Sequence, residues 1–177
     1  MGTKVASTSI SPTSSTTLNE VDMEGSPSLS SLEIGERLEV MRKQEDSTYF
    51  CIDYLKETTF PGMIDELCRT KMLTWCFQGA DLGMYSRNTV VIAMSYLDRF
   101  LSSDTPKAMS AIKIRKNYQL ACMTSLYMAI KLFEPYDMDT ATLVLLSKNS
   151  FTALEFSEME FDILSALSWH VHGKYVH

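Results

Sequence analysis

Apolar residues recur every three or four positions along most of the chain beyond residue 31, which is the spacing of helices rather than strands. From residue 86 to residue 101 they keep this period, at Val90, Val91, Met94, Leu97 and Leu101. From 110 to 133 they are too dense for a helix with one apolar face, which predicts a central, buried helix. Alternating strand patterns and internal repeats are not evident in the sequence. The pattern therefore predicts an all-α fold.

The residues before this region predict further helices. Residues 32–56 carry apolar positions suited to one or two amphipathic segments. Pro61 fits the first turn of a helix that continues to Gln78, because proline is tolerated at that position. Gly79 and Gly83 then predict a break.

Two more helices are expected after residue 133. Pro135 ends the central helix, and Asp139 or Thr140 can cap a short helix that follows. Thr152 and Glu155 have the spacing of a capping box, in which each side chain satisfies a backbone N–H that has no partner within the helix. This box predicts the start of the last core helix.

The first 31 residues differ from the rest in composition. They are rich in Ser and Thr, and the first aromatic residue of the chain is Tyr49. Such a segment buries too little apolar surface to offset the entropy of ordering it, so we expect residues 1–31 to be a disordered tail. Its two Ser-Pro dipeptides are minimal phosphorylation sites that a Ser-rich tail contains by chance.

Composition and charge exclude several classes of protein. The net charge is −6 without a block of Lys and Arg, which argues against nucleic acid as a partner. The longest uncharged run beyond the N-terminal 31 residues, 117–130, is shorter than a membrane span, so no membrane partner is expected. Four cysteines without a C-x-x-C pair, and the lack of an apolar signal segment, favour free thiols in a nuclear or cytoplasmic protein. They are Cys51, Cys68, Cys76 and Cys122.

Catalytic chemistry is not indicated either. The sequence lacks a nucleophile with its base, a phosphate-binding glycine loop and a metal-ligand spacing, so no catalytic residue, metal or cofactor is predicted. His170, His172 and His177 are expected to be solvated, since an H-x-H pair without a third ligand is weak support for a metal. An acid and base pair is a weaker interpretation of the carboxylates than the solvated face of a helix. These carboxylates are Glu155, Glu158, Glu160 and Asp162.

Several short motifs in the core occur in a characteristic order. They are residues 69–75 (RTKMLTW), 96–101 (YLDRFL), 118–120 (YQL), 129–131 (AIK), 133–134 (FE), 151–152 (FT) and 159–160 (ME). Together, across about 49–169, they resemble the N-terminal cyclin box. The resemblance implies a five-helix bundle around a central third helix. It also implies a docking-helix region at 32–60, the box at 61–170 and a C-terminal tail at 171–177.

The resemblance assigns expected roles to individual residues. It implies that Lys131 and Glu160 bind a cyclin-dependent protein kinase, beside the kinase C helix whose position controls the catalytic Lys-Glu ion pair. Without the motif, Lys131 would be interpreted as a snorkelling charge at a helix end. Arg69, Asp98 and Arg99 are expected to be structural. Arg69 resembles a buried arginine that would need an internal acceptor.

Trp75 resembles the centre of a patch that docks Arg-x-Leu peptides. The other patch residues would be Cys68, Met72, Gln78 and Gln119. Two positions depart from the family pattern: Lys71 stands where the patch is usually apolar, and Thr74 where an acidic residue is common. The alternative for Trp75 is a place in the core.

The expected function is that of a cyclin-like regulatory subunit that binds and activates a cyclin-dependent kinase in cell-cycle control. The alternative is a cyclin-fold adaptor that binds peptides or transcription machinery without activating a kinase. Many cyclins carry a second helical repeat, whereas this sequence ends at His177. A single-box cyclin and a truncated sequence both fit that ending.

Overall fold

The computed structural model describes residues 30–49, 51–56 and 63–171. Every regular element among these residues is an α-helix, so the predicted all-α class is confirmed. Most of the predicted N-terminal tail, Pro61 and residues 172–177 lie outside the described residues. The helices are α1 (Ser31–Thr48), α2 (Glu66–Gly83), α3 (Arg87–Leu101), α4 (Pro106–Lys113), α5 (Arg115–Phe133), α6 (Thr140–Leu146) and α7 (Ala153–Ala166).

The chain divides into two units, residues 1–38 and 39–177, with the division inside α1. At the start of α1, the backbone N–H and hydroxyl of the preceding Ser30 donate to the Glu33 carboxylate at 2.8 and 2.9 Å, and the Glu33 N–H donates to the Ser30 hydroxyl at 3.3 Å. These are the reciprocal bonds of a capping box, which the sequence analysis did not predict. Of the amphipathic segments expected over 32–56, the structure forms one helix, and residues 54–56 form a turn.

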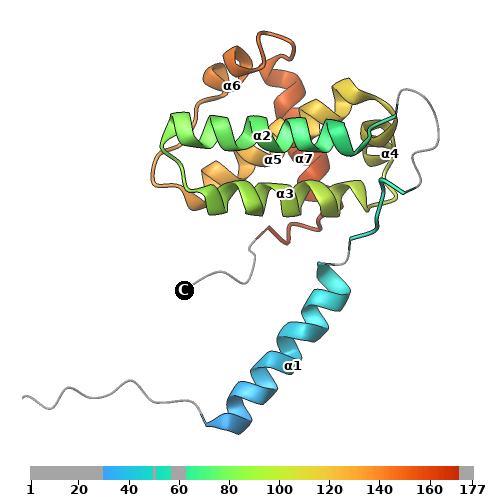
Figure 1. Cartoon of the computed structure of the whole chain (residues 1–177), viewed down its shortest axis with the longest axis vertical. Helices are drawn as coiled ribbons and strands as arrows, with labels where there is room; N and C mark the ends of the chain where they lie inside the picture. Colours follow the sequence, from blue (N-terminus) through green and yellow to red (C-terminus); the bar gives the residue numbers. More distant parts are fainter. Residues whose placement is uncertain (1–29, 50, 57–62, 172–177) are drawn as a thin grey trace, which may run out of the picture. The chain divides into compact units, whose positions relative to one another are not determined.

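The centre of the larger unit is α5, which packs against α2, α3, α4 and α7. In Figure 1, α2 and α3 lie side by side in front of α5. Eleven of its residues are buried, more than in any other described helix, as the density of apolar positions predicted. They are Tyr118, Leu120, Ala121, Cys122, Met123, Thr124, Ser125, Leu126, Met128, Ala129 and Ile130. The bundle around a central helix is confirmed, with α4 as an additional short helix.

Two expected boundaries were wrong. The continuous helix predicted over 110–133 is broken at Ile114, whose extended backbone separates α4 from α5. The helix predicted to begin near Pro61 begins instead at Glu66, where the Asp65 carboxylate accepts a hydrogen bond from the Cys68 N–H at 2.7 Å. A side-chain cap, rather than the proline, sets this start.

The glycines of α2 also behave differently from the prediction. Gly79 lies inside the helix, and the helix ends only at Gly83. A side chain at Gly83 would overlap the Tyr85 ring, so this position requires the close approach that glycine permits. The next residue, Met84, takes up the left-handed conformation that ends the helix, with φ 56°.

Three other predicted helix starts are confirmed. Ser86 caps α3, and Asp139 caps α6 by accepting a hydrogen bond from the Thr142 N–H at 2.8 Å. At α7, Thr152 and Glu155 form the complete capping box. These starts follow local side-chain chemistry, which explains why the sequence predicts them well.

Candidate functional site

Lys131 and Glu160 meet on the surface of the bundle. Lys131 lies in the last turn of α5, and Glu160 lies in α7, which packs against α5. The Lys131 Nζ donates to Glu160 Oε1 at 2.8 Å. Their side chains are 40% and 21% exposed. The predicted kinase-binding residues therefore form one charged group that solvent reaches.

A second contact orients Lys131. Its Nζ lies 5.1 Å from the centroid of the Tyr127 ring, one helical turn earlier in α5. The Tyr127 hydroxyl lies 3.3 Å from Thr140 Oγ1 at the start of α6. The hydrogen bond to Glu160 raises the pKa of Lys131 against the smaller opposing effect of burial, which keeps the ammonium charged. The sequence analysis missed Tyr127, although an aromatic residue four positions before Lys131 was a usable signal.

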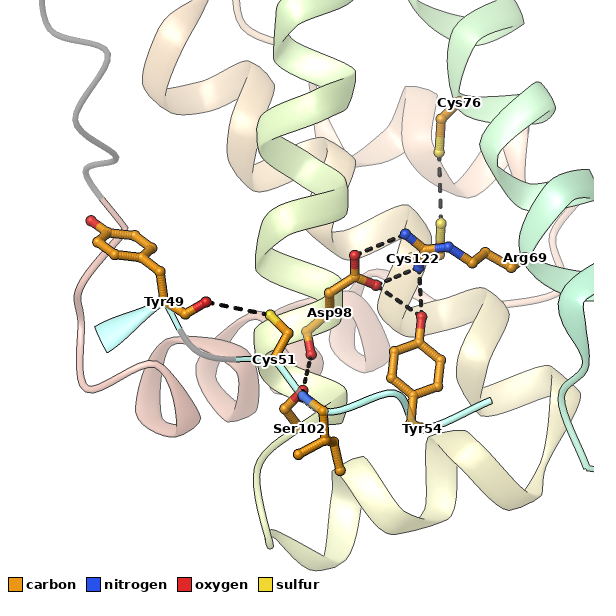
Figure 2. A network of polar contacts seen from close by, with 9 residues as sticks. Tyr49, Cys51, Tyr54, Arg69, Cys76, Asp98, Ser102 and Cys122 are labelled. Carbon is orange, nitrogen blue, oxygen red and sulfur yellow. Dashed lines mark hydrogen bonds and ion pairs between the residues drawn. The ribbon is translucent and has the colours of Figure 1, made fainter. Parts of the chain in front are cut away.

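The predicted structural residues Arg69 and Asp98 form a fork-like ion pair between α2 and α3 (Figure 2). One guanidinium nitrogen of Arg69 donates to Asp98 Oδ1, and the other donates to Asp98 Oδ2 at 2.8 Å. The expectation of a buried Arg69 was too strong, because its side chain is 28% exposed. The expected internal acceptor is present, and its hydrogen bond raises the pKa of Arg69.

Tyr54 completes this polar network. Its hydroxyl donates to Asp98 Oδ1 at 2.8 Å and accepts from Arg69 Nη1 at 2.5 Å. Burial, reinforced by the Asp98 charge, raises the pKa of Tyr54, so the phenol stays protonated and can act as a donor. Tyr54 lies 44 residues from Asp98 in the sequence, and no local pattern indicates this contact.

The next residue of α3 is held differently. Arg99 is 7% exposed, and its guanidinium lies 4.7 Å from the centroid of the Tyr49 ring. Burial lowers the pKa of Arg99. Nearby, the Ile52 N–H donates to the Ser102 hydroxyl at 2.9 Å, which attaches residues 51–56 to the end of α3. These contacts support a structural role for Asp98 and Arg99, which stays a prediction.

The candidate peptide-docking residues lie mostly on α2. Cys68, Met72 and Trp75 are spaced four and three apart, which places them on one face, and all three are half-buried against the core. Gln78 is exposed, and Gln119 is half-buried on α5, which packs against α2. Trp75 is thus neither a fully buried core residue nor a freely exposed one.

The two departures from the patch pattern are both on the surface. Lys71 and Thr74 are exposed on α2. The Thr74 hydroxyl donates to the Thr70 carbonyl at 2.9 Å, within its own helix. Neither residue is needed to build the core.

Comparison with known proteins identifies the family. The family model described as the N-terminal domain of cyclins matches residues 36–172. This chain belongs to the cyclin family. It is similar to the G2/mitotic-specific cyclin-B2 of Gallus gallus, with 27% identity over 150 residues that cover 85% of this chain and 35% of that protein. It is also similar to the G1/S-specific cyclin-D1 of Homo sapiens, with 26% identity over 137 residues that cover 76% of this chain and 42% of that protein.

This cyclin thus spans less than half the length of these two relatives. The predicted resemblance and the cyclin-box fold are confirmed by the family match and the helical structure. Cyclins are regulatory proteins, so the family supports a regulatory rather than a catalytic chain.

The remaining candidates for chemistry, where the structure describes them, take ordinary positions in this cyclin. His170 is exposed, and His172 and His177 lie outside the described residues. Glu155 belongs to the α7 capping box, and Asp162 pairs with Lys107 at 3.6 Å. In the part of the chain that the structure describes, His, Cys, Asp and Glu side chains form no cluster of three suited to a metal ion.

Over residues 30–49, 51–56 and 63–171, no helix is both long enough and apolar enough to cross a membrane.

Proposed function

We propose that this cyclin binds and activates a cyclin-dependent protein kinase in the control of the cell cycle, in the nucleus or cytoplasm, and catalyses no reaction itself. The observation that carries this proposal is the Lys131–Glu160 pair. The two residues lie at the matching positions of two separate cyclin-box motifs. In the folded chain the Lys131 Nζ is 2.8 Å from Glu160 Oε1.

The chemistry of the pair suits a protein interface. A lysine ammonium has three donors and a carboxylate has several acceptor sites, so the single bond between them leaves hydrogen-bonding capacity for a partner. The contact with Glu160 and the Tyr127 ring restricts the lysine before binding, which lowers the entropy cost of association. A kinase segment that covers the pair would receive both charges in a fixed arrangement.

Activation would follow from where the kinase is held. In protein kinases, the C helix carries the glutamate of the catalytic Lys-Glu ion pair, and its position controls activity. A cyclin that grips the neighbourhood of this helix shifts the kinase toward its active arrangement by binding that arrangement more tightly. All of the chemistry then belongs to the partner.

A second candidate function is the binding of substrates or inhibitors through Arg-x-Leu segments that they carry. The half-buried face of Cys68, Met72 and Trp75 favours it, because such a face offers apolar contact while remaining accessible. If this surface binds peptides and the chain activates no kinase, the protein is an adaptor with a cyclin fold.

The test is affinity capture of kinases from cell extract with the tagged chain, followed by mass spectrometry and an activity assay. Wild type should capture and stimulate a cyclin-dependent kinase, whereas Lys131→Ala and Glu160→Ala should not. Lys107→Ala is the matched control, because it breaks a surface ion pair to Asp162 on the same helix as Glu160. Capture of peptide-binding partners without a stimulated kinase would favour the adaptor.

A further inference from the structure

Two cysteines lie in direct contact in the core. Cys76 of α2 and Cys122 of α5 are 0% and 1% exposed, and their Sγ atoms are 3.6 Å apart. Figure 2 shows the two sulfurs facing each other beside the Arg69–Asp98 network. They are separated by 46 residues in the sequence, so the fold alone brings them together. The other two thiols are more accessible: Cys51 is exposed, and Cys68 is half-buried.

We propose that Cys76 and Cys122 form a reversible disulfide that joins α2 to α5 under oxidising conditions. A disulfide has an S–S length near 2.05 Å, so the gap must close by roughly 1.5 Å, which small side-chain rotations supply. The two helices already pack against each other. The linked product therefore keeps the α2–α5 contact that the bundle already has.

Disulfide formation needs an oxidant, and a small disulfide such as oxidised glutathione can serve as one. The thiolate of one cysteine attacks a glutathione sulfur, which forms a mixed disulfide and releases one reduced glutathione. The second cysteine then attacks the protein sulfur of the mixed disulfide, which releases a second reduced glutathione. The two protein thiols lose two electrons and two protons in total. The glutathione disulfide takes up these electrons and protons and becomes two molecules of reduced glutathione.

Burial of the two thiols should slow disulfide formation without disfavouring the product. The hydrogen bond with Cys76 and the burial of the site both raise the pKa of Cys122, so Cys122 holds little thiolate in the closed structure, and both thiols are shielded from glutathione there. The disulfide itself is uncharged, and an apolar core accepts it without a desolvation cost. The first step must then await local opening, and the reaction should be slow and should accelerate at higher pH.

The bond would act on the helices that carry the candidate binding residues. Cys76 directly follows Trp75 on α2, and Cys122 lies on the same helix as Gln119 and Lys131. A covalent link fixes the crossing of these helices and restricts the unfolded chain. The proposal stands on the thiol geometry and does not rest on kinase binding.

The experiment treats the purified, reduced wild-type chain with oxidised glutathione at neutral pH, without denaturant. Peptide mapping should find Cys76 linked to Cys122, with the loss of two hydrogen atoms. The melting temperature should rise on the order of 10 °C and return on reduction. A Cys51→Ser/Cys68→Ser variant retains only the buried pair. It should form the same link with the same rise in melting temperature, and its thiol titration should fall from two to none per chain.

Adding Cys76→Ala to that double variant supplies the control. This triple variant should form no intramolecular disulfide. The proposal is overturned if the buried pair stays reduced in the folded protein, if only glutathione adducts appear, or if the link forms solely at denaturant concentrations that unfold the chain. Linkage of Cys51 to Cys68 in its place would also overturn it.

Discussion

The Lys131 ammonium donates to the Glu160 carboxylate at 2.8 Å, across a sequence separation of 29 residues, at a part of the surface where both side chains keep access to solvent. An ion pair in this environment contributes little to folding, because water competes for both charges and two long side chains must be held still. Its geometry therefore calls for an explanation other than stability.

The first prediction concerns that stability. Lys131→Ala and Glu160→Ala should each change the free energy of unfolding by only about 0 to 1 kcal/mol. Urea unfolding followed by circular dichroism measures this directly. A loss well above that range in either variant would show that the pair is part of the framework of the fold.

The network of Tyr54, Arg69 and Asp98 should behave in the opposite way. Asp98→Ala leaves the Arg69 guanidinium without its carboxylate and should cost about 1.5 to 3 kcal/mol. Tyr54→Phe removes a hydroxyl that donates to Asp98 and accepts from Arg69 but leaves the ion pair in place, so it should cost less. The same unfolding measurement applies. Asp162→Ala, which breaks an exposed pair at 3.6 Å, is the control and should cost less than Asp98→Ala. Equal losses would contradict a structural role for Asp98.

The sequence predicts the helices of this fold better than their ends. Starts fixed by local side chains, such as Ser86, Asp139 and Thr152, are readable because the cap and its backbone partner lie within three residues. The break at Ile114 is not readable in this way, since neither proline nor glycine stands there and Ile114 carries no side-chain cap. The break lets α4 pack against α5, and such a contact belongs to tertiary structure, which local spacing does not reveal.

The α6 cap predicts a pH dependence. Hydrogen bonds from Thr142 lower the pKa of Asp139, so its contribution to stability is present above the ordinary carboxyl pKa and is lost as pH falls through the lowered value. Asp139→Asn keeps an acceptor oxygen but does not titrate. Between about pH 7 and about pH 3, the wild-type melting temperature should therefore fall more than that of Asp139→Asn. Parallel curves would contradict this account, and Asp137→Asn is the neighbouring control.

The candidate docking face can be tested with an Arg-x-Leu peptide. Trp75→Ala and Gln119→Ala should weaken peptide binding, with Trp75→Ala costing about tenfold or more, while kinase binding changes less. Leu145→Ala is the control, because Leu145 is an exposed apolar residue on α6, outside the candidate patch. Calorimetry with folded variants measures the affinities. Unchanged peptide affinity would reject the patch, and unfolding of Trp75→Ala would assign Trp75 to the core.

Only those residues of the candidate site that lie in recognisable sequence motifs could be predicted. Lys131 and Glu160 were found because each stands in a recognisable part of the cyclin box, and the fold then places them together. Tyr54 and the Cys76–Cys122 contact were not found. Each depends on chain segments that lie more than 40 residues apart, which no local spacing reveals.

Charge reversal tests the central claim most directly. The double variant Lys131→Glu/Glu160→Lys can keep an ion pair between α5 and α7. It exchanges the positions of the positive and negative charges, so each faces a partner group suited to the opposite charge. At a desolvated interface, truncating one such charge costs about 2 to 5 kcal/mol, or at least roughly tenfold in affinity. The measurement is the affinity of the captured kinase for wild type, each single reversal and the double, together with the stimulated kinase activity. The account predicts that all three variants fold, bind at least about tenfold more weakly and fail to stimulate the kinase. A double variant that binds and activates as wild type does would contradict it.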